Sequence, residues 1–158
     1  MKTYYIDKDI RGEAYKVLID FLGRYASSIL LMAHDNYATR SCRETLRKLT
    51  DFDEMVERVS EWPGTQLLSG KTALRHKFRA SLESVNFVRN HVNSLFSWCW
   101  PEKPEDLSFA MSDGRVLLLT TAHESYAEVT VYDDMPLPPA IEAILNTVTE
   151  EVNEESAT

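Results

Sequence analysis

The sequence has few of the residues and segments that mark secreted or membrane-bound proteins. Its 158 residues include only two cysteines, Cys42 and Cys99, which are too far apart in the chain for a C-x-x-C or zinc-ribbon spacing. The N-terminal stretch MKTYYIDKDI contains no apolar run long enough for a secretory signal, and no uncharged apolar run approaches the length of a membrane span. We therefore expect a cytoplasmic protein with two free thiols and no membrane segment.

Motifs of high specificity for catalysis or binding are also missing. A Gly-rich phosphate loop, an RNP motif and a helix-turn-helix signature do not occur. The composition, with 44% hydrophobic and 27% charged residues, is that of an ordinary globular protein, and the length suits one domain over residues 1–158.

Charge is distributed unevenly along the chain. The formal net charge is −8, but residues 1–100 carry an excess of +3 and residues 101–158 an excess of −11. An acidic C-terminal third repels nucleic acid and anionic membranes and suits a partner with a basic surface.

Basic residues gather at two places in the first two thirds of the chain. Because aromatic residues are not interleaved with them and the isoelectric point is about 5.0, we do not expect a nucleic-acid-binding protein. The residues of the two groups are Arg40, Arg43, Arg47 and Lys48, and Lys71, Arg75 and Arg79.

Apolar residues recur at three- and four-residue steps up to about residue 100, a rhythm typical of amphipathic helices. After a short strand at TYYI, the pattern predicts helices over about residues 9–32, 39–62 and 71–96, the second of them broken near LTDFDE. Residues 1–100 are therefore expected to form a mainly helical N-terminal layer of three to four helices.

The rhythm changes after Pro101. Alternation in DLSFAM and YAEVTVY, strand formers in VLLLTTAH and a turn at SDGR predict a small antiparallel three-stranded meander over residues 101–134. A closing C-terminal helix is expected over residues 138–153. The expected fold class is α+β, with the helical layer packed on one face of this sheet.

Trp98, Cys99 and Trp100 lie where the third expected helix ends. Pro101 and Pro104 prevent its continuation, so the segment is expected to be a seam between the helices and the sheet. The alternative is a nucleophilic Cys99, which would need His123 or His91 beside it as a base.

None of the four histidines is paired with another at a helical spacing, so we expect no metal site and no cofactor. The most suggestive polar stretch is TAHESYAE, where His123 is a candidate general base and Glu124 its neighbour. His34 is explained by a favourable position at the end of the first helix. A joint site of His34, His123 and Cys99 would require their loops to meet.

These observations favour a non-enzymatic, acidic protein-binding module, similar only in general class to immunity-type or phage-type inhibitors, that recognises a basic protein partner. The alternative is a small enzyme that uses His123 with Cys99 or Glu124. A homodimer formed through an apolar helical face is compatible with either function. The expected partner-binding residues are Glu102, Glu105, Asp106, Asp113, Glu124, Glu128, Asp133 and Asp134.

Overall fold

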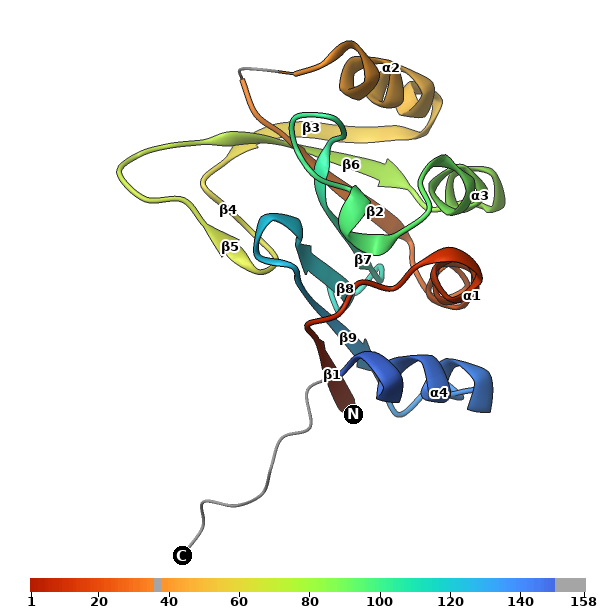
Figure 1. Cartoon of the computed structure of the whole chain (residues 1–158). Helices are drawn as coiled ribbons and strands as arrows, with labels where there is room; N and C mark the ends of the chain where they lie inside the picture. The colour runs from red at the N-terminus through yellow and green to blue at the C-terminus, as the bar shows by residue number, and fades with distance from the viewer. Residues whose placement is uncertain (36–37, 150–158) are drawn as a thin grey trace, which may run out of the picture.

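The computed structural model describes residues 1–35 and 38–149, which form one large antiparallel sheet with helices on one face (Figure 1). A small hairpin lies on the other face. The sheet has seven strands in the order β1-β9-β8-β7-β2-β6-β3, and each neighbouring pair is antiparallel.

The strands of the large sheet are β1 (Lys2–Ile6), β2 (Ser28–Ala33), β3 (Asp53–Val59), β6 (Ala73–Arg79), β7 (Glu105–Ala110), β8 (Val116–Thr121) and β9 (Tyr126–Val131). The hairpin consists of β4 (Glu61–Trp62) and β5 (Thr65–Gln66). The helices are α1 (Gly12–Gly23), α2 (Arg40–Leu49), α3 (Leu82–His91) and α4 (Pro139–Val148), and the 3₁₀ turns are η1 (Thr50–Phe52), η2 (Leu95–Ser97) and η3 (Ala122–Glu124).

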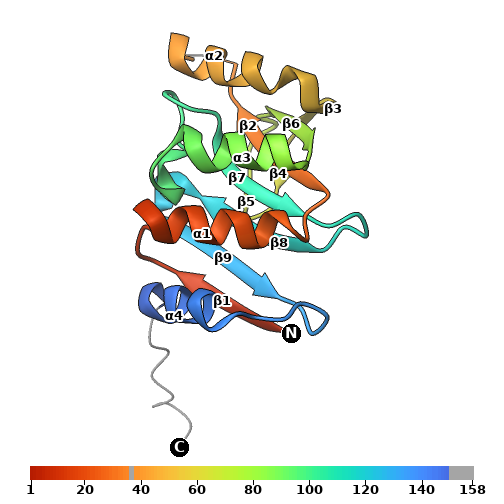
Figure 2. The same cartoon turned by 90° about the vertical axis from the view of Figure 1, so that its right-hand side faces the viewer.

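The helices α4, α1 and α3 lie side by side across the strands (Figure 2). Their apolar residues and those of the central strands form the main core, whereas a smaller cluster of Met32, Trp62 and Ala73 lies beneath the hairpin. Within the described part of the chain, no helix has the length and apolarity needed to cross a membrane.

The expected fold class is wrong, because the first hundred residues do not form a helical layer. Strands β2, β3 and β6 lie within segments that the apolar rhythm assigned to helices. The consecutive strands β7, β8 and β9 belong to the seven-stranded sheet rather than to a separate small meander.

The three- and four-residue apolar spacing predicts helices where strands form, and two strands show why. Strand β2, with the sequence SILLMA, is buried at every residue because it is covered on both faces, and an uninterrupted apolar run is compatible with a helix or a strand. In β6, Leu74 and Phe78 are four residues apart, a spacing that fits one turn of a helix and also two steps of a strand.

The last helix ends earlier than expected, since α4 covers Pro139–Val148. Residues 150–153 of the expected helix 138–153 lie outside the described residues.

The Trp98-Cys99-Trp100 segment joins the two faces of the molecule. Trp98 is fully buried, and its indole N–H donates to the Tyr15 hydroxyl at 3.0 Å, which in turn donates to the Val88 carbonyl at 2.7 Å. This chain of hydrogen bonds anchors the segment to α1 and α3. Cys99 and Trp100 are thereby held beside the site described below.

Helices α1 and α3 approach each other closely at Gly23. A Cβ atom at this position would lie 2.5 Å from Cγ1 of Val85. We therefore expect Gly23→Ala to lower the free energy of unfolding by about 1–2 kcal/mol, because the overlap outweighs the better helix propensity of alanine.

Urea denaturation of Gly23→Ala, Val85→Ala and the double variant measures this contact. The double variant should lose less stability than the sum of the single variants, since Val85→Ala removes the overlapping methyl groups. Strict additivity would show that the overlap has no energetic consequence.

Candidate functional site

The candidate site is built at the start of β7, where the strand carries one extra residue. Partners of β2 step from Ser108 to Glu105 while β2 itself advances only from Leu30 to Met32. Asp106 lies inside this bulge and has a φ of +57°, in the left-handed region that residues other than glycine rarely adopt. The strict alternation of the strand is interrupted here, so neighbouring Glu105 and Asp106 both line the same cavity.

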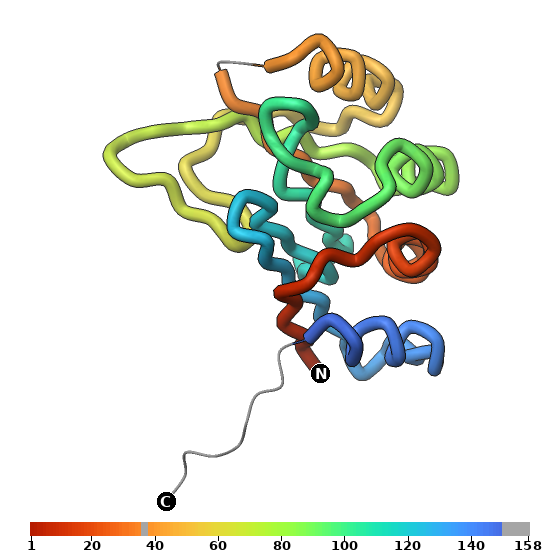
Figure 3. Tube along the Cα trace, viewed as in Figure 1, coloured from red at the N-terminus to blue at the C-terminus, as the bar shows by residue number. Residues whose placement is uncertain are grey.

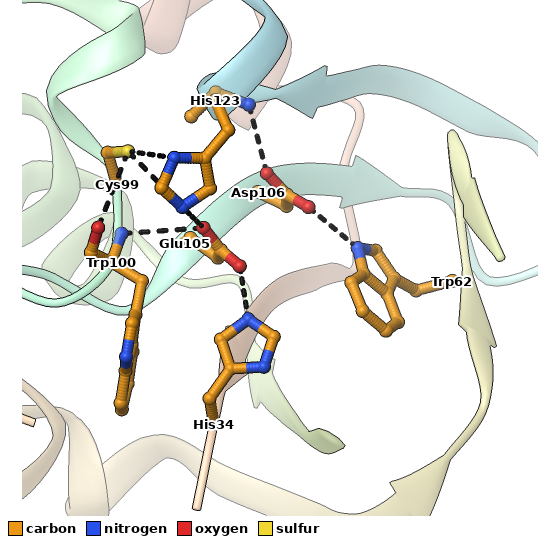
Figure 4. A network of polar contacts seen from close by, with 8 residues as sticks. His34, Trp62, Cys99, Trp100, Glu105, Asp106 and His123 are labelled. Atoms are coloured by element: carbon orange, nitrogen blue, oxygen red, sulfur yellow. Dashed lines mark hydrogen bonds and ion pairs between the residues drawn. The ribbon is translucent and has the colours of Figure 1, made fainter. Parts of the chain in front are cut away.

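Glu105 is the centre of the polar network (Figure 4). It is only 4% exposed, and its two carboxylate oxygens contact two different histidines. Oε1 makes a hydrogen bond with Nε2 of His34, and Oε2 lies 2.9 Å from Nε2 of His123. The backbone N–H of Trp100 also donates to Oε2 at 3.4 Å. The carboxylate therefore holds three separate segments of the chain together.

The charges of this network are mutually dependent. Burial by itself would raise the pKa of Glu105, but the hydrogen bond from His34 and the two neighbouring imidazoles bring it below its ordinary value. The same hydrogen bond raises the pKa of His34.

Cys99 completes the group. Its Sγ lies 3.6 Å from Nδ1 and 3.9 Å from Nε2 of His123. One donor atom from each of Cys99, Glu105 and His123 can be chosen so that all three lie within 4.8 Å of one another. A thiol, a carboxylate and an imidazole are the three side-chain types that bind zinc in proteins.

Asp106 has a different role from Glu105, because backbone and indole N–H groups occupy both of its oxygens. The Ala122 N–H donates to Oδ1 at 3.0 Å, and Nε1 of Trp62 donates to Oδ2 at 2.8 Å. Burial raises the pKa of Asp106, although both hydrogen bonds oppose the shift. The carboxylate ties the hairpin to the turn that carries His123.

A cavity of about 390 Å³ opens beside the network, within the size range of small-molecule sites. The β4–β5 hairpin forms one wall and the turn after β8 another, and the chain trace shows these distant segments coming together (Figure 3). The lining residues are His34, Trp62, Gly64, Thr65, Gln66, Leu67, Glu105, Asp106, Thr121, His123 and Glu124.

The structure brings together the residues that the sequence proposed for catalysis. His34 and His123 both contact Glu105, and Cys99 lies beside His123, so the three loops do meet (Figure 4). Glu124 lines the same cavity as His123. Adjacent residues of a regular strand face opposite sides of the sheet, but His123 and Glu124 both lie in the 3₁₀ turn η3, so this restriction does not apply to them.

The residues proposed for partner binding do not form one surface. Glu105 and Asp106 are buried in the site, Glu124 is exposed at its cavity, and Glu102 is exposed in the loop before β7. At the opposite ends of the strands, Arg115 pairs with both Asp113 and Asp134. Asp133 pairs with the N-terminal amine, and Glu128 accepts from the Tyr126 hydroxyl at 2.6 Å. The interaction with a basic partner stays a prediction.

Sequence reasoning missed the central residue of the site and its supports. Glu105 and Asp106 were assigned to a partner-binding surface, His34 to a helix end, and Trp62 to the end of the second expected helix. A usable signal was present: His34 directly follows the apolar run SILLMA, and His123 follows VLLLTTA, so both stand where a buried strand ends.

No protein-family model matches this chain, and comparisons with curated proteins and with solved structures gave no match. The function must therefore be argued from the geometry alone.

His91 lies outside this site, in a separate polar group between α2 and α3. Its Nε2 is 2.8 Å from the Thr45 hydroxyl and 3.0 Å from Nζ of Lys103. Burial, followed by the positive charges of Lys103 and Lys48, lowers the pKa of His91 to about 4. The folded protein therefore keeps this imidazole neutral.

This shift makes stability depend on pH. The unfolded chain takes up a proton at His91 near its ordinary pKa of about 6.5, so stability should fall as the pH drops from there towards about 4. The imidazole is partly exposed, and we expect the loss to be about 1–2 kcal/mol after solvent screening.

Urea denaturation of wild type and His91→Gln over this pH range gives the measurement. The variant should lose less stability on acidification, because glutamine does not titrate. Parallel curves for the two proteins would show that His91 is not responsible.

Proposed function

We propose that this protein is a metal-dependent hydrolase that holds a transition-metal ion, zinc by preference, between Cys99, Glu105 and His123. The observation that carries the proposal is the convergence of these three donor atoms within 4.8 Å at the edge of the cavity. Soft thiolate and borderline imidazole ligands favour zinc over magnesium or calcium.

The distances fit such a centre with small adjustments. In a tetrahedral zinc site the Zn–S distance is about 2.3 Å and the Zn–N and Zn–O distances about 2.0–2.2 Å, which separates neighbouring donor atoms by about 3.3–3.6 Å. Here Sγ is 3.9 Å from Nε2 of His123, and that nitrogen is 2.9 Å from Oε2 of Glu105. Side-chain shifts of a few tenths of an ångström would equalise these two separations, and the Sγ–carboxylate pair, which lies within 4.8 Å, would close by up to about 1.3 Å.

Three protein ligands beside a cavity are typical of a catalytic rather than a structural zinc site. A structural site is closed by four protein ligands, whereas a catalytic one leaves a position for water. Glu105 and His123 both line the cavity, so the fourth position of an ion bound to them would face it. Zinc lowers the pKa of bound water to about 7 and so supplies a nucleophile at neutral pH.

His34 supports this centre as a positioning residue. It contacts the carboxylate oxygen of Glu105 that does not face His123, and its ring packs edge-on against Trp100 at 5.3 Å between centroids. Such outer contacts orient the ligand carboxylate towards the ion.

A nucleophilic Cys99 is less well supported than a zinc-bound one. Cys99 does not line the cavity, where a substrate would lie. Burial, followed by the carboxylates of Glu105 and Asp106, raises the pKa of the Cys99 thiol, which is the reverse of what a thiolate nucleophile needs. A bound cation would compensate for these negative charges.

Metal titration tests the proposal. We expect wild type to bind one equivalent of Zn²⁺ in calorimetry, and Co²⁺ to give the charge-transfer absorption of a cobalt–thiolate bond. Cys99→Ser should weaken zinc binding by about 100-fold or more and abolish the cobalt–thiolate absorption.

Cys42→Ala is the matched control, because Cys42 is buried in α2 away from the cavity. It should leave both signals unchanged. Zinc binding that is no tighter in wild type than in Cys99→Ser would overturn the proposal.

The contribution of His34 is measured in the same assays. His34→Ala should weaken zinc binding by about 10- to 100-fold while the cobalt–thiolate absorption persists, since the thiolate ligand is intact. His34→Gln, which retains a donor for Glu105, should recover part of the affinity. Equal losses in both variants would argue against an orienting hydrogen bond.

A further inference from the structure

The charge of the cavity restricts what the metal centre can bind. Among the described residues that line it, three are carboxylates and none is lysine or arginine. The carboxylates are Glu105, Asp106 and Glu124. Phosphate groups are usually recognised by arginine, lysine or a helix N-terminus, and the lining offers no basic side chain for them.

A bound ion does not reverse this charge. The Cys99 thiolate and the Glu105 carboxylate together balance the two positive charges of zinc. Asp106 and Glu124 then remain as negative groups in the wall. His123 is neutral when it binds zinc, so a proton on His34 would offset only one of these two charges. The loaded cavity therefore attracts cations and repels anions.

Glu124 is the carboxylate best placed to bind a positively charged group of a substrate. It is exposed in η3, directly after the ligand His123, and within the described chain it makes no hydrogen bond or ion pair. Asp106, by contrast, is already occupied by the N–H groups of Ala122 and Trp62.

The opposite wall offers neutral polar and aromatic groups. The Thr65 hydroxyl is buried and has no hydrogen-bond partner among the residues that the structure describes, and the Gln66 side chain is exposed beside it. Trp62 and Leu67 contribute apolar surface. A neutral acyl group fits such a wall, because it offers a polar atom for the exposed Gln66 amide and apolar atoms for Trp62.

We propose that the substrate is a carboxylic amide or ester that carries an amine or guanidinium group close to the scissile bond, and that Glu124 binds this positive charge. The proposal rests on the metal-dependent function proposed above. Zinc held by Cys99, Glu105 and His123 would supply a water-derived nucleophile, whose oxygen would bond to the carbonyl carbon as the bond to the leaving nitrogen or oxygen breaks. One proton of the water leaves with the amine or alcohol, and the other belongs to the carboxylic acid produced.

Hydroxamates of matched shape test the charge preference without requiring turnover, because a hydroxamate binds zinc through its own oxygens. The probes are the hydroxamates of Nα-acetyl-lysine, Nα-acetyl-norleucine and Nα-acetyl-glutamate, with inorganic phosphate as a further anion. We expect the zinc-loaded protein to bind the lysine probe about fivefold tighter than the norleucine probe, and the glutamate probe and phosphate more weakly than either. The preference should shrink in about 1 M salt.

Glu124→Gln should bind the lysine and norleucine probes with nearly equal affinity and should bind zinc as wild type does. The matched control is Glu13→Gln, since Glu13 is an exposed carboxylate on α1, across the sheet from the cavity. This control should keep the fivefold preference.

The outcomes separate this proposal from the proposed function. A wild-type protein that binds no zinc refutes the metal-dependent function itself. Zinc binding with equal affinity for all three hydroxamates, with tighter binding of phosphate, or with no hydroxamate binding overturns the substrate class. A lysine preference that survives in Glu124→Gln overturns the role of Glu124.

Discussion

The extra residue in β7 determines where the functional side chains of this protein point. In a regular strand, Glu105 and Asp106 would face opposite sides of the sheet, one of them towards the helices. The bulge opposite β2 and the positive φ of Asp106 place both carboxylates at one cavity instead. A left-handed conformation at a residue other than glycine costs of order 1 kcal/mol, so it persists only where surrounding contacts compensate.

The carboxylates of Asp106 and Glu105 have different contacts and therefore different roles. Asp106 accepts hydrogen bonds from Trp62 and Ala122, and so fixes the hairpin and the turn that form the walls of the cavity. Glu105 is left to contact the two imidazoles, whose hydrogen-bonding nitrogens offset the cost of burying a carboxylate. Asp106 thus fixes the walls of the cavity, and the neighbouring Glu105 carboxylate is the one available for metal binding.

The sequence allowed part of this site to be predicted and concealed the rest. The possibility that Cys99 and His123 meet followed from residue types, and the alternation of YAEVTVY identified a strand correctly. The bulge could not be predicted from the sequence, because the residue with positive φ is Asp106 and not a glycine, which would have indicated such a conformation. The strands β2 and β6 were taken for helices because their apolar patterns fit a helix as well as a strand. In β2 the apolar run is continuous, and in β6 the apolar residues are four positions apart.

The acidic residues of the C-terminal third do not form a uniformly charged surface. Among the described residues, Asp113, Asp133 and Asp134 pair with Arg115 and the N-terminus at one end of the strands, and Glu105, Asp106 and Glu124 lie at the cavity at the other end. The first group is balanced locally and projects little field. The second is concentrated around a cavity whose low-dielectric walls strengthen its field. Part of the negative charge of this segment is therefore concentrated at the cavity, where it can select a ligand, and this concentration is what favours a cationic substrate in our proposal.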